Sequence, residues 1–129
     1  MKYPIAIEPG SESEAFGVVV PDLPGCYSAG DTLDEALDNA REAIELWIET
    51  VLDDNGVVPA PSSIDEHQSN PAYAGWIWGV VPIDLTSLSD KVEQVNITLP
   101  ARVLRRIDAA AQAAGESREA YMTKKALIG

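Results

Sequence analysis

Two side chains of this sequence could act as a nucleophile and its base: the only cysteine, Cys26, and the only histidine, His67. Cys26 lies in PDLPGCYSAGDTLDEAL, residues 21–37, where turn formers and acids crowd together as in many catalytic loops. A thiol nucleophile needs a base and a group that orients that base. His67, however, falls in an aperiodic polar loop. We therefore predict a buried and inert Cys26, because free cysteine is among the most buried residue types.

Carboxylates are the second group of side chains that could act in catalysis, since a magnesium-dependent nuclease needs several of them to converge on the metal ion. Glu8 and Asp84 stand at the ends of predicted strands and could approach each other. Other acids have a structural cause, because turns and helix starts favour them. These are Asp22, Asp31, Asp34, Glu35 and Asp38. The sequence therefore favours a non-enzymatic protein without metal or cofactor, and an RNA hydrolase stays an alternative.

Charge divides the chain sharply. Residues 1–90 carry 2 basic and 17 acidic side chains, a net charge of −15, whereas residues 91–129 carry 7 basic and 4 acidic ones, a net charge of +3. An acidic surface repels nucleic acid and attracts basic proteins, and a basic segment does the reverse. The division suggests two partners of opposite charge, although an acidic surface can also serve solubility alone.

The sequence contains neither an export signal near its start nor an apolar run long enough to span a bilayer. A single cysteine also rules out a disulfide within one chain. We therefore expect a cytoplasmic protein that does not contact membranes.

The N-terminal part has the pattern of an α+β unit. Alternation predicts a hairpin over residues 3–20 and a short strand over 26–29, and WIWGVVPIDL, residues 76–85, predicts a strand beside the hairpin. Between them, apolar residues at helical spacing run from a capping box at Thr32 and Glu35 to Gly56. Residues 57–75 are aperiodic and predict a loop. The unit is predicted to be an antiparallel sheet of three or four strands packed on one long helix.

The outward face of this helix carries a row of acids that alternates with the apolar stripe. Such a row is usually a solvated surface, but beside a basic partner it becomes a candidate docking surface that raises the association rate. Its members are Asp38, Glu42, Glu45 and Glu49.

The last 37 residues combine a strand with two helices. EQVNITLP, residues 93–100, alternates strictly, with Val95, Ile97 and Leu99 on one face. Two helical patterns follow, separated by Gly115 and with Ser117 as the predicted cap of the second. A lone strand cannot satisfy its own backbone, so we expect it to pair with its twin in a homodimer. A helix-turn-helix is an alternative, but strand period precedes the helices.

This tail resembles a ribbon-helix-helix DNA-binding unit. In that class a paired ribbon enters the major groove and its outward side chains read base edges. The resemblance implies base readout by Gln94, Asn96 and Thr98, and a phosphate contact at the start of the second helix, where free N–H groups and the dipole favour anions. By position, the phosphate residues are Glu116, Ser117 and Arg118.

Over nearly its full length, the order of hairpin, PDLPGC, GDT-x-x-EA, acidic helix, tryptophan-bearing strand and ribbon tail resembles the HicB antitoxin family. The resemblance implies a partial ribonuclease H-like domain at 1–85, a linker at 86–92 and a ribbon-helix-helix domain at 93–129. It implies an antitoxin that neutralises a basic HicA-type ribonuclease toxin and represses its own operon by binding operator DNA. A homodimer follows, and higher oligomers remain open. Besides the RNA hydrolase, a ligand-sensing repressor without a toxin is an alternative.

Overall fold

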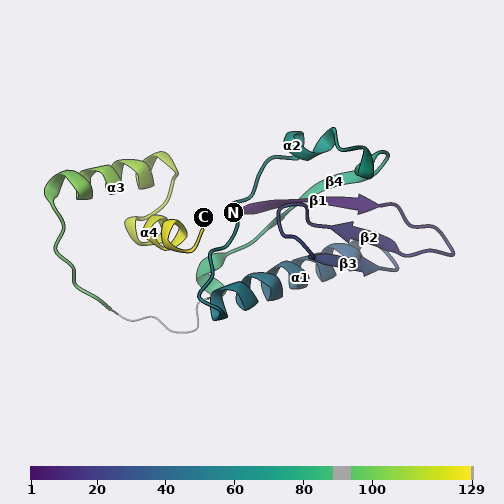
Figure 1. Cartoon of the computed structure of the whole chain (residues 1–129), viewed down its shortest axis with the longest axis horizontal. Helices are drawn as coiled ribbons and strands as arrows, with labels where there is room; N and C mark the ends of the chain where they lie inside the picture. Colours follow the sequence, from purple (N-terminus) through teal and green to yellow (C-terminus); the bar gives the residue numbers. More distant parts are fainter. Residues whose placement is uncertain (89–93, 129) are drawn as a thin grey trace.

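The computed structural model describes residues 1–88 and 94–128. An antiparallel sheet with strand order β3-β2-β1-β4 forms the centre of the N-terminal unit (Figure 1). Its strands are β1 (Lys2–Glu8), β2 (Phe16–Val19), β3 (Tyr27–Gly30) and β4 (Ile77–Pro82). The predicted hairpin is confirmed as β1 and β2, and the predicted strand at residues 76–85 is confirmed as β4 beside β1.

Helix α1 (Leu33–Asp53) covers one face of this sheet. Its start is confirmed at Thr32, whose hydroxyl oxygen accepts a hydrogen bond from the Glu35 backbone N–H at 3.1 Å. The end of β3 approaches the first turn so closely that a Cβ at Gly30 would lie 2.4 Å from the Ala36 backbone nitrogen. Glycine is therefore required at this position for the helix to pack on the sheet.

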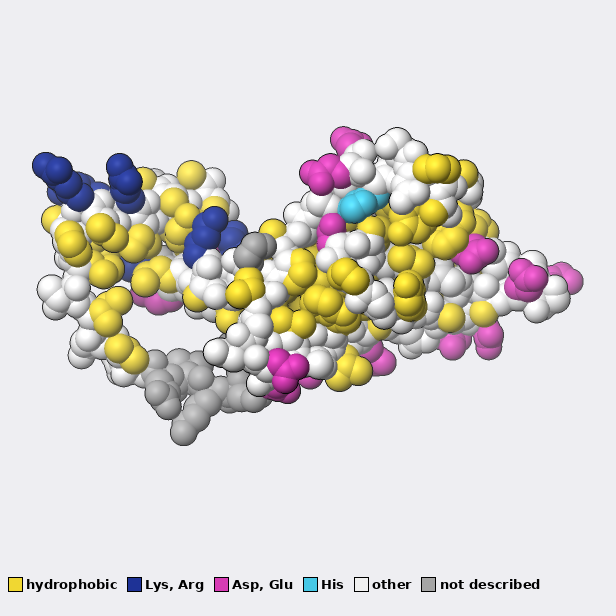
Figure 2. Space-filling model, viewed as in Figure 1, with side chains coloured by type: hydrophobic (Ala, Val, Ile, Leu, Met, Phe, Trp, Pro, Cys, Tyr) yellow, Lys and Arg dark blue, Asp and Glu magenta, His cyan; other side chains and the backbone are white. Residues whose placement is uncertain are grey.

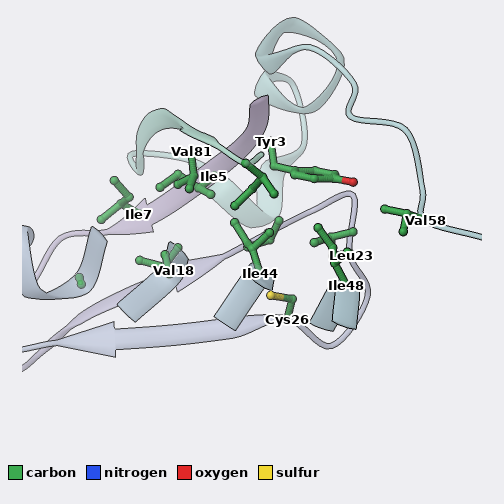
Figure 3. Packing of buried hydrophobic residues seen from close by; sticks show 14 of the residues in the cluster. Tyr3, Ile5, Ile7, Val18, Leu23, Cys26, Ile44, Ile48, Val58 and Val81 are labelled. Carbon is green, nitrogen blue, oxygen red and sulfur yellow. The ribbon is translucent and has the colours of Figure 1, made fainter. Parts of the chain in front are cut away.

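The hydrophobic core lies between α1 and the sheet. Ile44 and Ile48 of α1 and Tyr3 and Ile5 of β1 have no solvent-exposed surface, and Figure 3 shows them meeting in one cluster. Cys26 lies beside Ile44 in the same cluster and is 4% exposed, as the sequence predicts. Burial of these apolar side chains is the main source of stability for the unit.

Residues 57–75 are not the plain loop that the sequence predicts. They contain α2 (Ile64–Gln68) and the short 3-10 helix η1 (Pro71–Tyr73), which lie on the side of the sheet opposite α1 (Figure 1). Trp78 of β4 stacks on His67 at 6.4 Å between ring centroids and meets Tyr73 edge to face at 5.5 Å. These aromatic contacts hold the segment on the sheet.

The tail contains the two predicted helices, α3 (Ala101–Ala113) and α4 (Arg118–Leu127). Gly115 adopts a φ of +69° between them, and the Ser117 hydroxyl caps α4 by accepting from the Ala120 N–H at 3.1 Å. The end of α4 joins the N-terminal unit, because the Val58 N–H donates to the Leu127 carbonyl at 2.7 Å. The tail is therefore attached to the core at its far end.

Two predictions about the connection differ from the structure. Residues 94–100 form no strand, because the single chain offers no strand for them to pair with, and position 93 lies outside the described residues. The proposed linker, 86–92, begins inside the 3-10 helix η2 (Leu85–Leu88), and residues 89–92 also lie outside the described part.

Candidate partner-binding surfaces

The acidic row of α1 lies where the sequence places it. Asp38, Glu42 and Glu49 are exposed, whereas Glu45 is partly covered and accepts a hydrogen bond from Arg41 Nε at 3.1 Å. Such an exposed i,i+4 ion pair contributes little stability, but it neutralises one member of the row. Figure 2 shows acidic side chains along the lower border of the N-terminal unit, where α1 runs, and basic ones on the tail. The row offers three unpaired carboxylates and one that is already partnered.

An apolar groove of about 480 Å³ borders this row. One wall is α1, with Leu46 and Trp47, and the other is the segment from Gly25 to Tyr27. Leu46 is 65% exposed and Tyr27 is 66% exposed. The apolar stripe of α1 does not predict the groove, but Leu46 is an apolar residue outside that stripe and could have signalled it.

The structure separates Cys26 from any base. Its thiol is packed in the core, and burial raises its pKa, so the nucleophilic thiolate is disfavoured. His67 is hydrogen-bonded instead to Ser62 and Asp22, with Nε2 lying 2.6 Å from Ser62 Oγ and 3.0 Å from Asp22 Oδ1. The expectation that His67 lies in an unstructured loop is therefore wrong.

Ser62, His67 and Asp22 have the residue types of a serine hydrolase triad but not its geometry. In a triad the carboxylate binds the imidazole nitrogen opposite the serine. Here Asp22 Oδ1 lies 2.6 Å from Ser62 Oγ and contacts the same imidazole nitrogen as the serine. Asp22 Oδ2 also accepts from the Ser62 backbone N–H at 2.8 Å. The cluster therefore ties the segment before α2 to the turn after β2.

The carboxylates considered for metal-dependent cleavage do not assemble. In the antiparallel register Lys2 pairs with Pro82 and Ile7 with Ile77, so Glu8 and Asp84 lie beyond opposite ends of the β1–β4 pair. The prediction that they could approach each other is wrong, because β1 alone spans about 20 Å. Within residues 1–88 and 94–128, no group of three or more His, Cys, Asp or Glu side chains could hold a metal.

The segment before α3 presents both faces of the predicted ribbon to solvent. Gln94, Asn96 and Thr98 are exposed, as base-reading side chains must be. Val95 and Ile97 are also 70% and 62% exposed, respectively. Figure 2 shows the hydrophobic side chains of this extended segment uncovered. An exposed apolar row of this kind is a candidate interaction surface.

The proposed phosphate residues lie together at the start of α4, but all three side chains are engaged within the tail. Arg118 donates two hydrogen bonds to the Asp108 carboxylate, at 2.7 and 2.9 Å. Glu116 accepts from Lys124 Nζ at 2.5 Å. The hydrogen bonds from Arg118 hold the Asp108 pKa below its usual range. Ser117 is occupied as the helix cap, so the N–H groups of the first turn are what this segment offers an anion.

Comparisons with known proteins identify the family. A family model described as a HicB-like antitoxin of bacterial toxin-antitoxin systems matches residues 3–126. The chain belongs to this antitoxin family. It is 48% identical over 108 residues to an uncharacterized 14.9 kDa protein of Haemophilus phage HP1, covering 84% of this chain and 80% of the phage protein.

Solved structures agree with this assignment. The antitoxin HicB of Burkholderia pseudomallei superposes with a TM-score of 0.80 at 38% identity, covering 98% of this chain and 96% of that chain. One chain of a HicA3 and HicB3 toxin-antitoxin complex matches with a TM-score of 0.55 at 33% identity, covering 65% of this chain and 99% of that chain. The α+β fold with a four-stranded antiparallel sheet is thus a HicB antitoxin fold. Within the described residues, no helix is long and apolar enough to cross a membrane.

Proposed function

We propose that this HicB-family chain is a cytoplasmic antitoxin that binds and neutralises a small basic HicA-type ribonuclease toxin. The observation that carries the proposal is the exposed acidic row on α1, within residues 1–90 that together carry a net charge of −15. The match to one chain of a HicA3 and HicB3 complex supports it. Complementary charge accelerates encounter and selects a basic partner, so the row acts mainly on the association rate.

The test of toxin binding uses a small basic HicA-type protein. A variant with Asp38→Asn, Glu42→Gln, Glu45→Gln and Glu49→Gln is expected to associate about tenfold or more slowly at low salt, with the difference shrinking at high salt. The matched control neutralises four exposed acids away from α1, which are Glu12 and Glu14 of the β1–β2 loop and Asp65 and Glu66 of α2. Failure of the wild-type chain to bind any such basic protein at low salt would overturn the proposal.

We propose in addition that the tail represses the operon as a ribbon-helix-helix homodimer. In this arrangement, residues 94–100 of two chains pair as a ribbon, which covers Val95 and Ile97 and leaves Gln94, Asn96 and Thr98 outward for operator bases. The start of α4, at Glu116, Ser117 and Arg118, would hold a phosphate through the N–H groups of Ser117 and Arg118, because the Glu116 N–H already donates to the Ala111 carbonyl at 2.9 Å. Further association of dimers is left open. The uncovered apolar row and the basic charge of the tail support this role.

The DNA role is tested by replacing Gln94, Asn96 and Thr98 together with alanine and measuring binding to operator and to unrelated DNA. Lost base contacts should remove the preference, because each good bidentate contact contributes about 1–3 kcal/mol of discrimination. Gln112→Ala, an exposed amide on α3, is the control and should keep the preference. Retained preference in the triple variant would remove the ribbon from the reading role.

A further inference from the structure

The groove beside α1 has two large apolar side chains turned outward at its borders. Leu46 and Tyr27 are each about two-thirds exposed, and Trp47 lies between the helix and the turn, with its indole Nε1 donating to the Pro24 carbonyl at 3.1 Å. Trp47 is therefore held in a fixed position and forms a rigid wall of the groove. Scattered exposed apolar residues are ordinary, but two that line one groove mark a surface suited to a partner.

The acids of the row lie at different distances from Leu46 on the helix surface. Glu42 precedes Leu46 by four residues and Glu49 follows it by three, so both lie beside it on the helix surface. Glu45 lies on the other side of the row, where it is bonded to Arg41. The groove is therefore bordered by the unpaired acids Glu42 and Glu49, and the neutralised pair lies farther away.

This arrangement defines the chemistry of the occupant. The apolar floor suits an aliphatic or aromatic side chain, and the acidic border suits lysine or arginine beside it. A second copy of this chain fits poorly, because an isologous contact across the groove would bring two acidic borders together. A basic protein that carries an apolar side chain flanked by cations satisfies both features.

We propose that the groove formed by Gly25–Tyr27 and by Leu46 and Trp47 of α1 is the anchor site for one apolar side chain of the basic toxin, with Glu42 and Glu49 binding the cations beside it. The inference rests on the proposed antitoxin function and deepens it. Buried apolar anchors in pockets dominate interface energies, whereas charges at the border act on encounter. The groove therefore controls dissociation and the acids control association.

The experiment measures association and dissociation rates of the toxin with the full-length chain and its variants. Leu46→Ala should raise the dissociation rate about tenfold, as expected for loss of a central anchor of about 1.4 kcal/mol. Its association rate and salt dependence should stay near those of the wild type. Alanine is the best helix former, so α1 should stay intact. Tyr27→Ser, on the opposite wall, should show the same selective effect.

Ile77→Ala is the matched control, because Ile77 is a large apolar residue, 44% exposed, on the edge strand farthest from β3. It should leave both rates unchanged. A wild-type chain that binds no basic toxin would defeat the antitoxin proposal itself. A wild type that binds while Leu46→Ala and Tyr27→Ser dissociate at its rate would overturn the groove alone. Loss of self-association in Leu46→Ala, seen by sedimentation without a change in toxin dissociation, would instead assign the groove to a second copy.

Discussion

The two parts of the chain bury their apolar residues very differently. In residues 1–88, strands and α1 enclose side chains such as Tyr3, Ile5 and Ile44 with no exposed surface. In residues 94–128, Ala111 is the only residue in the buried class, and Val95, Ile97 and Val103 are exposed. The N-terminal unit thus encloses its core within one chain, whereas the tail leaves apolar side chains exposed. Under the proposed function, partner binding would be added to a complete fold in the N-terminal unit and would complete the fold in the tail.

The largest effect should come from breaking the apolar row of the tail. Ile97→Asp places a charge where two copies would bury isoleucine, and the loss is about 3–6 kcal/mol for the two side chains of a dimer. The dimer dissociation constant should rise more than about a hundredfold, while urea unfolding of the N-terminal unit stays unchanged. Asn96→Asp is the control, since it adds the same charge on the opposite face. Sedimentation of Ile97→Asp as an intact dimer at micromolar concentration would contradict the ribbon.

The next largest effect should come from a cavity introduced into the hydrophobic core of the N-terminal unit. Ile44→Ala should lower the free energy of unfolding by about 2–5 kcal/mol, because it removes a fully buried side chain between α1 and the sheet. Val103→Ala, at a position 42% exposed on α3, should cost far less in the monomer. Urea unfolding followed by far-ultraviolet circular dichroism measures both, because the helices of the tail contribute to this signal although all three tryptophans lie in the N-terminal unit. Equal losses would show that the tail is as well packed as the N-terminal unit.

The N-caps of α1 and α4 allow the N-terminal unit and the tail to be compared through the same type of hydrogen bond. Thr32 and Ser117 each accept one backbone hydrogen bond at 3.1 Å, so Thr32→Ala and Ser117→Ala remove equivalent contacts. Thr32→Ala should lower the unfolding free energy by about 0.5–2 kcal/mol. Ser117→Ala should mainly speed amide exchange in the first turn of α4, because that helix has no residue in the buried class. Thr50→Ala in the interior of α1 is the control, and a global loss in Ser117→Ala as large as in Thr32→Ala would contradict the comparison.

Elements that depend on local interactions can be predicted from the sequence, whereas those held by contacts between distant residues cannot. The hairpin, α1, α3 and α4 follow from local period and caps, and their existence is confirmed. The structure of residues 57–75 does not follow from local pattern, because contacts with residues about 40 to 56 positions away hold it, as in the Ser62–Asp22 and Tyr3–Pro59 hydrogen bonds.

The candidate sites show the same limit. Helical spacing places the acidic row correctly, because side-chain direction follows from period alone. It cannot show that Arg41 neutralises Glu45 or that the turn at Gly25 forms a groove with Leu46, because both depend on the folded positions of side chains. The proposed ribbon strand is a further case, because the partner proposed for it is a second copy and residues 94–100 of the single chain form no strand.

The smallest effect concerns the ion pair between Asp108 and Arg118, which joins α3 to α4. Hydrogen bonds from Arg118 lower the Asp108 pKa below its ordinary value of 3.8. Because the folded pKa is the lower one, this pair stabilises the tail fully above pH 3.8, and the contribution is lost as the pH falls through the folded pKa. Carbon-13 NMR titration of the Asp108 carboxyl should show the lowered value, and Arg118→Gln should return it toward 3.8. Lys125→Gln, on the same helix, should leave the Asp108 pKa lowered.

Both side chains of the Asp108–Arg118 ion pair are nearly half exposed, so loss of the pair should alter the junction of α3 and α4 without unfolding the N-terminal unit. A titration in which Arg118→Gln leaves the Asp108 pKa unchanged would show that another group lowers this pKa, and would remove the Arg118 ion pair from the junction of the two tail helices.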